Sequence, residues 1–169
     1  YKMIKSKNFT IRPFRKDDEK SLISNINNKD IYKYTVRIPY PYKTGDAKLW
    51  IKKCVNEYKK TLINFAIDIN DEVIGGIGFD PIEGHKAEIG YWLGKKYWNK
   101  GIVTEAVKLF TEYGFNNIKL KRITAHVFSK NKASSRVLEK NGYKLEGILK
   151  KHHNKDGKLI DALLYAKVK

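Results

Sequence analysis

The hydrophobic pattern of the chain switches repeatedly between the two-residue period of strands and the three-to-four-residue period of helices. A sheet whose strands alternate with amphipathic helices must bury those helices against its faces. The order β, α, α, β, β, β, α, β, α, β, β therefore predicts an α/β (α+β) fold with one mixed sheet and helices on both sides. The predicted strands cover residues 9–12, 64–69, 72–79, 87–93, 122–128, 143–149 and 161–168, and the helices 15–28, 44–58, 103–116 and 134–140.

Local signals refine several of these elements. Asn70-Asp71 is typical of a hairpin turn, and Asn141-Gly142 is a good end for a short helix. The basic segment 150–158 is predicted to be a loop. Alternation places Ile89, Tyr91 and Leu93 on one face of their strand and Glu88, Gly90 and Trp92 on the other.

The helix at residues 44–58 carries the single cysteine of the chain. Trp50, Cys54, Val55 and Tyr58 fall on one helical face, which favours a core position for Cys54 over a nucleophilic one. One cysteine excludes an internal disulfide, and no Cys/His cluster has zinc-ligand spacing. These counts predict a reducing compartment, with the cytoplasm as the default, and no metal.

Length and composition favour one folded domain over residues 1–169, because no repeat, low-complexity tract or Pro/Gly/Ser-rich linker divides the sequence. No apolar run approaches the roughly 18 residues that span a bilayer, and residues 1–10 lack the apolar segment of a signal peptide. We therefore expect no membrane association.

The charge is strongly unbalanced, with 35 basic and 18 acidic residues and a net charge of +17. Such a field attracts polyanions: nucleic acid, an acidic ribosomal surface, or the phosphates of a nucleotide cofactor. The alternative is purely compositional, with lysine filling surface positions that carry no function.

The start of the helix near residue 103 is suited to an anionic ligand. The first turn of a helix has unpaired N–H groups and the positive end of the helix dipole, and Gly101 would let phosphate oxygens approach the backbone. Lys96 and Lys100 would add positive charge. The alternative is that the glycine only makes a turn, which is common between strands and helices.

Six segments together resemble the GNAT acetyltransferase superfamily, and within it the RimJ/RimL branch of ribosomal-protein N-terminal acetyltransferases. Residues 87–93 (Ala-Glu-Ile-Gly-Tyr-Trp-Leu) and 97–106 (Tyr-Trp-Asn-Lys-Gly-Ile-Val-Thr-Glu-Ala) are similar to the acetyl-CoA-binding motif. Residues 131–143 (Asn-Lys-Ala-Ser-Ser-Arg-Val-Leu-Glu-Lys-Asn-Gly-Tyr) with 145–147 resemble the second motif. Shorter matches lie at residues 12–15, 39–42, 75–78 and 161–166, in the family's order.

The resemblance implies a GNAT fold with six to seven strands and about four helices, which binds acetyl-CoA as cosubstrate. The general pattern is Arg or Gln, two residues, Gly, one residue, and Gly or Ala; this chain has Trp98 first and Val103 last. Val103 would contribute a backbone N–H, with crowding by its β-branch the open question. The cofactor-binding residues carried over are Trp92, Leu93, Asn99, Lys100, Gly101, Ile102, Val103, Thr104, Asn131 and Ser134.

Members of this family transfer acetyl by direct attack of an amine on the thioester, and the chain has no Gly-x-Ser-x-Gly elbow or Cys/His pair. Glu88 is the first candidate for the general base, with a structural ion pair as the alternative. A glutamate of the RimL members aligns here with His153, which is either a base or a solvated loop residue. Ser134 is a candidate to protonate or stabilise the thiolate, and Tyr165 a second donor; Asn131 is both a ligand candidate and an N-cap.

The predicted function is N-acetylation of a primary amine, with a protein N-terminus, such as that of a ribosomal protein, as the preferred acceptor. By analogy residues 31–42, rich in tyrosine, would line the acceptor groove. Polyamines and aminoglycosides are disfavoured, because the positive field repels polycations. The alternatives are a small-molecule acetyltransferase and a non-catalytic ribosome- or nucleic-acid-binding protein of the same fold. The oligomeric state stays open between monomer and homodimer.

Overall fold

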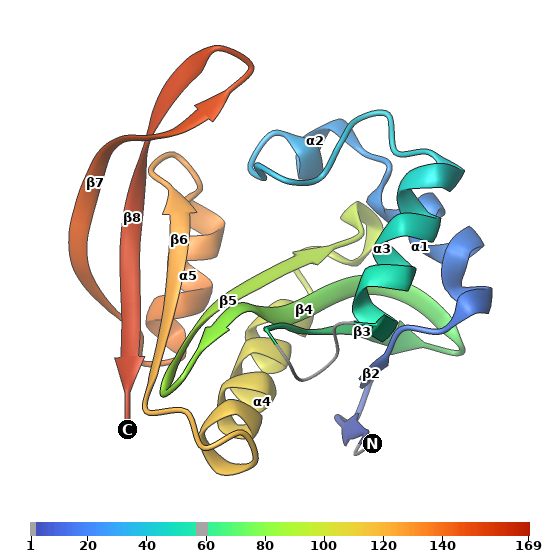
Figure 1. Cartoon of the computed structure of the whole chain (residues 1–169), viewed down its shortest axis with the longest axis horizontal. Coiled ribbons are helices and arrows are strands. Elements are labelled where there is room, and N and C mark those ends of the chain that lie inside the picture. Colours follow the sequence, from blue (N-terminus) through green and yellow to red (C-terminus); the bar gives the residue numbers. More distant parts are fainter. Residues whose placement is uncertain (1–2, 57–60) are drawn as a thin grey trace.

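The computed structural model describes residues 3–56 and 61–169, and its strands form one mixed sheet of eight in the order β1-β2-β3-β4-β5-β6-β8-β7 (Figure 1). Described helices number five, besides two short 3-10 turns. The strands are β1 Ile4–Lys5, β2 Thr10–Pro13, β3 Ile63–Ile69, β4 Glu72–Glu83, β5 Lys86–Leu93, β6 Arg122–Phe128, β7 Lys144–Lys155 and β8 Lys158–Val168. The helices are α1 Glu19–Ile26, α2 Lys29–Tyr32, α3 Thr44–Asn56, α4 Ile102–Asn116 and α5 Lys132–Lys140, with turns η1 Lys16–Asp18 and η2 Lys95–Tyr97.

Helices cover the two faces of the sheet in separate groups, as the sequence predicts (Figure 1). The larger core joins α4 and α5 to one face, where Phe110 stacks on Phe79 with ring centroids 4.5 Å apart. The smaller core joins α1, α2 and α3 to the other face through residues such as Leu22, Ile51 and Ala66. Each helix thus buries its apolar side on a sheet face of alternating side chains.

One pair of strands interrupts the regular antiparallel ladder. β5 and β6 are parallel, and they pair only over Lys86–Glu88 and Arg122–Thr124. Both strands continue beyond that point, β5 to Leu93 and β6 to Phe128, but they diverge (Figure 1). The sheet is therefore open in its middle, along the edge of β5 that faces β6.

Most predicted elements are confirmed within one or two residues, and the strand at residues 122–128 is found with the predicted bounds. Asn70 and Asp71 both have positive φ, 53° and 64°, which is the geometry of a type I′ hairpin turn. Cys54 is buried in the smaller core, 4% exposed. Gly142 follows α5 with φ 79°, as a helix stop does.

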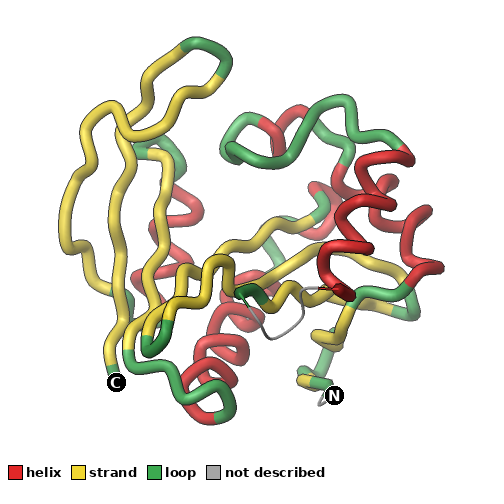
Figure 2. Tube along the Cα trace, in the orientation of Figure 1, coloured by secondary structure: helices red, strands yellow, loops and turns green. Residues whose placement is uncertain are grey.

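The segment 150–158 is not a loop, which corrects the sequence prediction. β7 and β8 run through it and are joined by the two-residue turn Asp156-Gly157, with φ 51° and 83° (Figure 2). Its lysines and histidines give no apolar alternation, so the strand period is invisible there. The Asp-Gly pair was the available signal for the hairpin.

Other differences are smaller. The family-based count of six to seven strands and about four helices was low, because β1 and α2 are too short to show a period. The first predicted helix divides into η1 and α1, and α5 begins at Lys132 instead of residue 134. Val55 is 57% exposed and does not lie on the buried face of α3. Tyr58, predicted on the same face, lies outside the described residues.

Candidate active site

The N-terminus of α4 presents unpaired backbone donors. Gly101 is its N-cap, with φ 77°, and no side chain caps the helix. The first hydrogen bond inside the helix runs from the Glu105 N–H to the Gly101 carbonyl at 3.1 Å. The N–H groups of the three preceding residues, Ile102, Val103 and Thr104, therefore precede the helical ladder and point out of its positive end. An anion is the ligand for which such an end is suited.

Two side chains set the position of this helix start. The Trp98 indole N–H donates to the Leu93 carbonyl at 2.8 Å, which ties the loop to the end of β5. The Asn141 amide donates to the Thr104 carbonyl at 3.1 Å and so links α4 to the end of α5. Val103 is partly buried, with its side chain packed against the larger core. Asn99, with φ 61°, and Lys100 are exposed in the loop before the helix.

The open edge of β5 leads toward this helix start. Between Ile89 and Leu93 the strand pairs with β4 on one side, while its pairing with β6 has already ended at Glu88. The side chain of Trp92 lies over Gly76, where a Cβ would come within 2.4 Å of the indole nitrogen. Leu93 is buried in the larger core. The side chains of Trp92 and Leu93 thus pack internally, and their backbone is what the open edge offers.

A hydroxyl pair lies where α5 faces β5. The Ser134 hydroxyl is 2.7 Å from the Tyr91 hydroxyl, and burial raises the pKa of Tyr91 to about 12. Tyr91 is therefore a neutral phenol near pH 7 and can share its proton with Ser134. Asn131 is confirmed as the N-cap of α5, because its side chain accepts from the Ser134 N–H at 3.3 Å.

Tyr165 does not join this hydroxyl pair. Its hydroxyl donates to Glu139 at 2.9 Å, and burial is the main cause that raises its pKa. The ring is 4% exposed in the larger core. The phenol that contacts Ser134 is thus Tyr91, which alternation in the sequence places on one strand face with Ile89 and Leu93, without a chemical role.

Glu88 and His126 form a close carboxylate–imidazole contact at the point where β5 and β6 diverge. A Glu88 carboxylate oxygen contacts the Nδ1 atom of His126. His126 lies two residues beyond Thr124, the last residue of β6 that pairs with β5. The hydrogen bond from this imidazole to Glu88 raises the pKa of His126, against the effect of burial. Both side chains stay partly exposed, 34% for Glu88 and 23% for His126.

His153 lies on β7, paired with Ile160, and not in a loop as predicted. Its ring lies 5.1 Å from Phe128, and that of the adjacent His152 stacks on His126 at 5.3 Å. Burial, then His152 and His126, lower the pKa of His153, so it is neutral near pH 7. Three histidines therefore gather around Glu88, from two strands far apart in the sequence.

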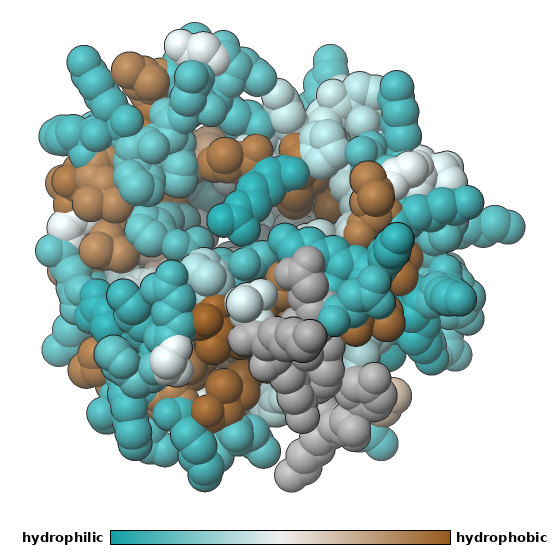
Figure 3. Space-filling view, viewed as in Figure 1, coloured by the Kyte–Doolittle hydropathy of each residue, from teal (hydrophilic) through white to brown (hydrophobic). Residues whose placement is uncertain are grey.

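An open space lies beside this cluster, above the middle of the sheet. Gly90 is exposed there, and nothing lies within 4 Å of the position where its Cβ would be. The tip of the β7–β8 hairpin reaches α2 over this side, where the Tyr32 hydroxyl donates to Asp156 at 2.6 Å. Figure 3 shows the surface hollowed between this hairpin and α2, with hydrophilic residues over most of the face. Tyr34, edge-on to Phe128 with centroids 6.5 Å apart, adds to the wall. We call this space the groove.

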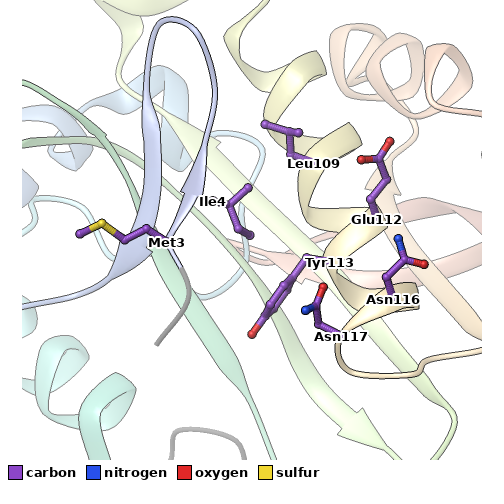
Figure 4. A pocket seen from close by; sticks show the side chains of 7 residues that line it. All are labelled: Met3, Ile4, Leu109, Glu112, Tyr113, Asn116 and Asn117. Carbon is purple, nitrogen blue, oxygen red and sulfur yellow. The ribbon is translucent and has the colours of Figure 1, made fainter.

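A second hollow, of about 270 Å³, lies elsewhere, between β1 and the C-terminal part of α4 (Figure 4). Its lining includes Ile4, Leu109 and Tyr113 and contains none of the predicted site residues. Within residues 3–56 and 61–169, no three histidine, cysteine or acidic side chains are arranged to hold a metal ion. No helix described there is long and apolar enough to cross a membrane.

The structure thus brings the predicted residues into three places. The residues of the α4 N-terminus form the anion-binding end, Asn131 and Ser134 with Tyr91 flank the open strand, and Glu88 with His153 face the groove. Tyr165 stands apart, bonded to Glu139. His126, Tyr91 as a hydroxyl donor and Gly90 as the groove floor were missed. Alternation along β6 places His126 on the same face as Thr124, but it does not say which strand lies alongside. The parallel register between β5 and β6 is what brings His126 beside Glu88.

Known proteins share this arrangement over nearly the whole chain. Residues 8–144 match the family model described as the acetyltransferase (GNAT) domain. An uncharacterized N-acetyltransferase, p20, of Bacillus licheniformis is 31% identical over 164 residues, covering 95% of this chain and 92% of the relative. The ribosomal-protein-serine acetyltransferase of Escherichia coli is 34% identical over 106 residues, covering 62% and 59%.

Two solved structures superpose closely. A GNAT-family acetyltransferase from Bacillus anthracis is 30% identical, with a TM-score of 0.86 and 99% and 98% of the two chains covered. RimL, a ribosomal L7/L12 α-N-protein acetyltransferase in complex with coenzyme A, has a TM-score of 0.92 at 20% identity, with the same coverage, and shares the fold. The parted sheet, the helix start and these matches have one explanation: the chain belongs to the GNAT family of N-acetyltransferases.

Proposed function

We propose that the chain transfers acetyl from acetyl-CoA to the primary amine of a protein N-terminus, by direct attack in a ternary complex. The observation that carries the proposal is the parting of β5 and β6, which runs from Glu88 and His126 to the free N–H groups of α4. One end of this gap suits phosphate, and the other suits an amine that must lose a proton.

The residues present fit coenzyme A. Ile102, Val103 and Thr104 would donate their N–H groups to its pyrophosphate, since no side chain caps this end of the helix and the Val103 side chain packs against the larger core. Asn99, Lys100 and Gly101 complete the exposed phosphate loop. The open edge of β5, at Trp92 and Leu93, supplies backbone groups for the pantetheine arm, with Asn131 on its other side. When bound, the cosubstrate supplies an activated acetyl thioester.

Three groups of the chain would then act on the reaction. A backbone N–H near Leu93 would stabilise the developing oxyanion. Ser134, hydrogen-bonded to Tyr91, would deliver a proton to the departing thiolate, with Tyr165 as the less well placed donor because it is bonded to Glu139. Glu88 would help to remove the proton of the acceptor amine from the groove side, and His153 is the second candidate.

A protein N-terminus is the preferred acceptor for two reasons. RimL is named as an α-N-protein acetyltransferase, and the name of the ribosomal-protein-serine acetyltransferase gives a ribosomal protein as its acceptor. The net charge of +17 favours acceptors that are not polycations, which argues against polyamines and aminoglycosides. A groove wide enough to leave Gly90 exposed, yet bridged by Tyr32 and Asp156, suits a narrow chain end.

The test is a thiol-release assay with acetyl-CoA and a library of N-terminal peptides, with spermidine and an aminoglycoside as the other arms. We expect release to be stimulated by peptides and CoA to raise the thermal midpoint of the protein. Stimulation by a small amine alone would change the acceptor class. No stimulation by any amine, no shift with CoA, and tight salt-dependent RNA binding in a gel shift would instead support a non-catalytic protein.

A further inference from the structure

Glu88 on β5 and His126 on β6 lie on opposite sides of the gap, at the end where the two strands begin to diverge. Glu88 and Thr124 are the last residues through which β5 and β6 pair with each other. If the parallel pairing continued, His126 would lie opposite Gly90, on the same face of the sheet. The strands have parted there, and the Glu88 carboxylate instead contacts Nδ1 of His126 across the gap. The open position above Gly90, which has nothing within 4 Å of where its Cβ would lie, is therefore on the same face of the sheet as His126.

We propose that His126 is the group that takes the proton of the acceptor ammonium, and that Glu88 is the residue that positions it. This inference rests on the proposed function and changes the role of one of its residues. A carboxylate on Nδ1 holds the N–H on that nitrogen and leaves the lone pair on Nε2. The stacked ring of His152 covers the face of the His126 imidazole and not its edge, and 23% of the side chain stays exposed.

The protons and bonds of the transfer balance with this assignment. The acceptor arrives as an ammonium, and neutral His126 takes one of its protons, directly or through one water. The freed amine forms the C–N bond as the C–S bond breaks. A second nitrogen proton passes to water as the amide forms, the thiolate takes a proton from Ser134, and the Ser134–Tyr91 pair regains one from water. His126 then returns its proton to water, so one proton is released per acetyl transferred.

The surroundings of His126 determine how this base responds to pH. Glu88 faces it from β5, and His152 and His153 face it from β7, while β8 contributes the apolar Leu164 at the paired position. The hydrogen bond to Glu88 raises the pKa of His126 above the ordinary value of 6.5. Below that raised pKa Nε2 carries a proton and cannot accept another. Activity should therefore rise as pH increases through a value above 6.5.

The test compares His126→Gln, Glu88→Gln and the control His85→Gln, which removes a histidine from the β4–β5 turn. Rates are measured with acetyl-CoA and peptides that begin with Ser or Ala, from pH 5.5 to 9. The same acceptor serves all proteins, so its own titration cancels. Proton NMR of the imidazoles in the protein alone gives the His126 pKa without any activity.

We expect His126→Gln to lower kcat by about 100-fold or more with little change in KM, and to remove the acidic limb. Glu88→Gln should move that limb, and the NMR titration of His126, to lower pH, while His85→Gln matches the parent. A parent-like kcat and limb in His126→Gln would overturn the inference and leave the proposed function standing. So would a His126 titration that Glu88→Gln does not move. Absence of acetyl transfer to every amine would overturn both.

Discussion

At the scale of single residues, Gly90 offers a steric test of the groove. Its Cβ position is open, and it has no positive φ, so a side chain can be added without strain. Gly90→Val should leave the free energy of unfolding within about 0.5 kcal/mol of the parent, because valine is favoured in strands. The added methyl groups would occupy the space above the sheet. We therefore expect KM for a peptide acceptor to rise about tenfold, measured at saturating acetyl-CoA.

Gly45→Val is the control for this change. Gly45 lies in the first turn of α3, is also exposed, and has nothing within 4 Å of its Cβ position. We expect its KM values to match the parent. Equal KM values in the Gly90 and Gly45 variants would mean that the acceptor does not pass over the middle of the sheet.

The Ser134–Tyr91 hydroxyl pair should behave as one unit. Burial holds the pKa of Tyr91 at about 12, so the phenol keeps its proton and can pass it through Ser134. Ser134→Ala and Tyr91→Phe should each lower kcat about tenfold or more, and the double variant should lose little beyond the worse single one. A double-mutant cycle on kcat measures this coupling.

Tyr143→Phe is the matched control, because it removes another buried Tyr hydroxyl, which lies 2.7 Å from Thr111. It should cost about 1 kcal/mol of unfolding free energy and leave kcat at the parent value. If the effects of Ser134→Ala and Tyr91→Phe on kcat simply add, the two hydroxyls do not act together as a proton relay.

At the scale of elements, the sequence predicted the helices and strands that are long enough to show a hydrophobic period. α4 and β6 were found because four or more apolar positions recur within each of them. α2 has four residues, fewer than two turns, so no period can show. The outer half of the β7–β8 hairpin was missed because both of its faces carry polar side chains, Lys151 and His152 among them.

The candidate site divides in the same way. Its anion-binding end could be predicted because it is local: a glycine and the helix that follows it carry the whole arrangement. The base end depends on the register between β5 and β6, whose paired residues lie 36 positions apart in the chain and number only three on each strand. Periodicity assigns a side chain to a face but not to a neighbouring strand, so His126 could not be matched to Glu88.

The phosphate-binding role of the α4 N-terminus can be tested at Gly101, the N-cap residue of that helix. Gly101 has φ 77° and open space at its Cβ position. Gly101→Ala should cost about 1–2 kcal/mol through the left-handed backbone and place a methyl group where phosphate oxygens would approach. We expect Kd for CoA to rise about tenfold, measured by calorimetry.

Gly84→Ala separates the two effects, since Gly84 also has a positive φ, 61°, and an open Cβ position, but lies in the β4–β5 turn. It should lose similar stability and bind CoA as the parent does. A parent-like Kd in Gly101→Ala would remove Gly101 from the phosphate site, whatever its stability.

At the scale of the whole molecule, the two parts of the parted sheet are bridged on the groove side. The hairpin tip contacts α2 through the Asp156–Tyr32 hydrogen bond, and the Lys155 ammonium lies 3.2 Å from the centroid of the Tyr32 ring. These contacts join the β7–β8 hairpin to α2, an element of the smaller core. In the proposed function the acceptor would enter beside this bridge, into a protein whose basic residues outnumber its acidic ones by 35 to 18.

The excess of basic over acidic residues predicts which peptide acceptors react fastest. A field from 35 basic and 18 acidic residues attracts negatively charged acceptors and is screened within about 8–10 Å at physiological salt. Peptides that begin with Ser and continue with Glu and Asp should have a kcat/KM at least about tenfold above Ser-Lys-Lys peptides in 20 mM salt. The ratio should fall toward one in 500 mM salt, because screening removes the long-range attraction. A ratio near one at both salt concentrations would mean that the charge reflects composition alone, and a ratio unchanged by salt would locate the preference in direct contacts within the groove.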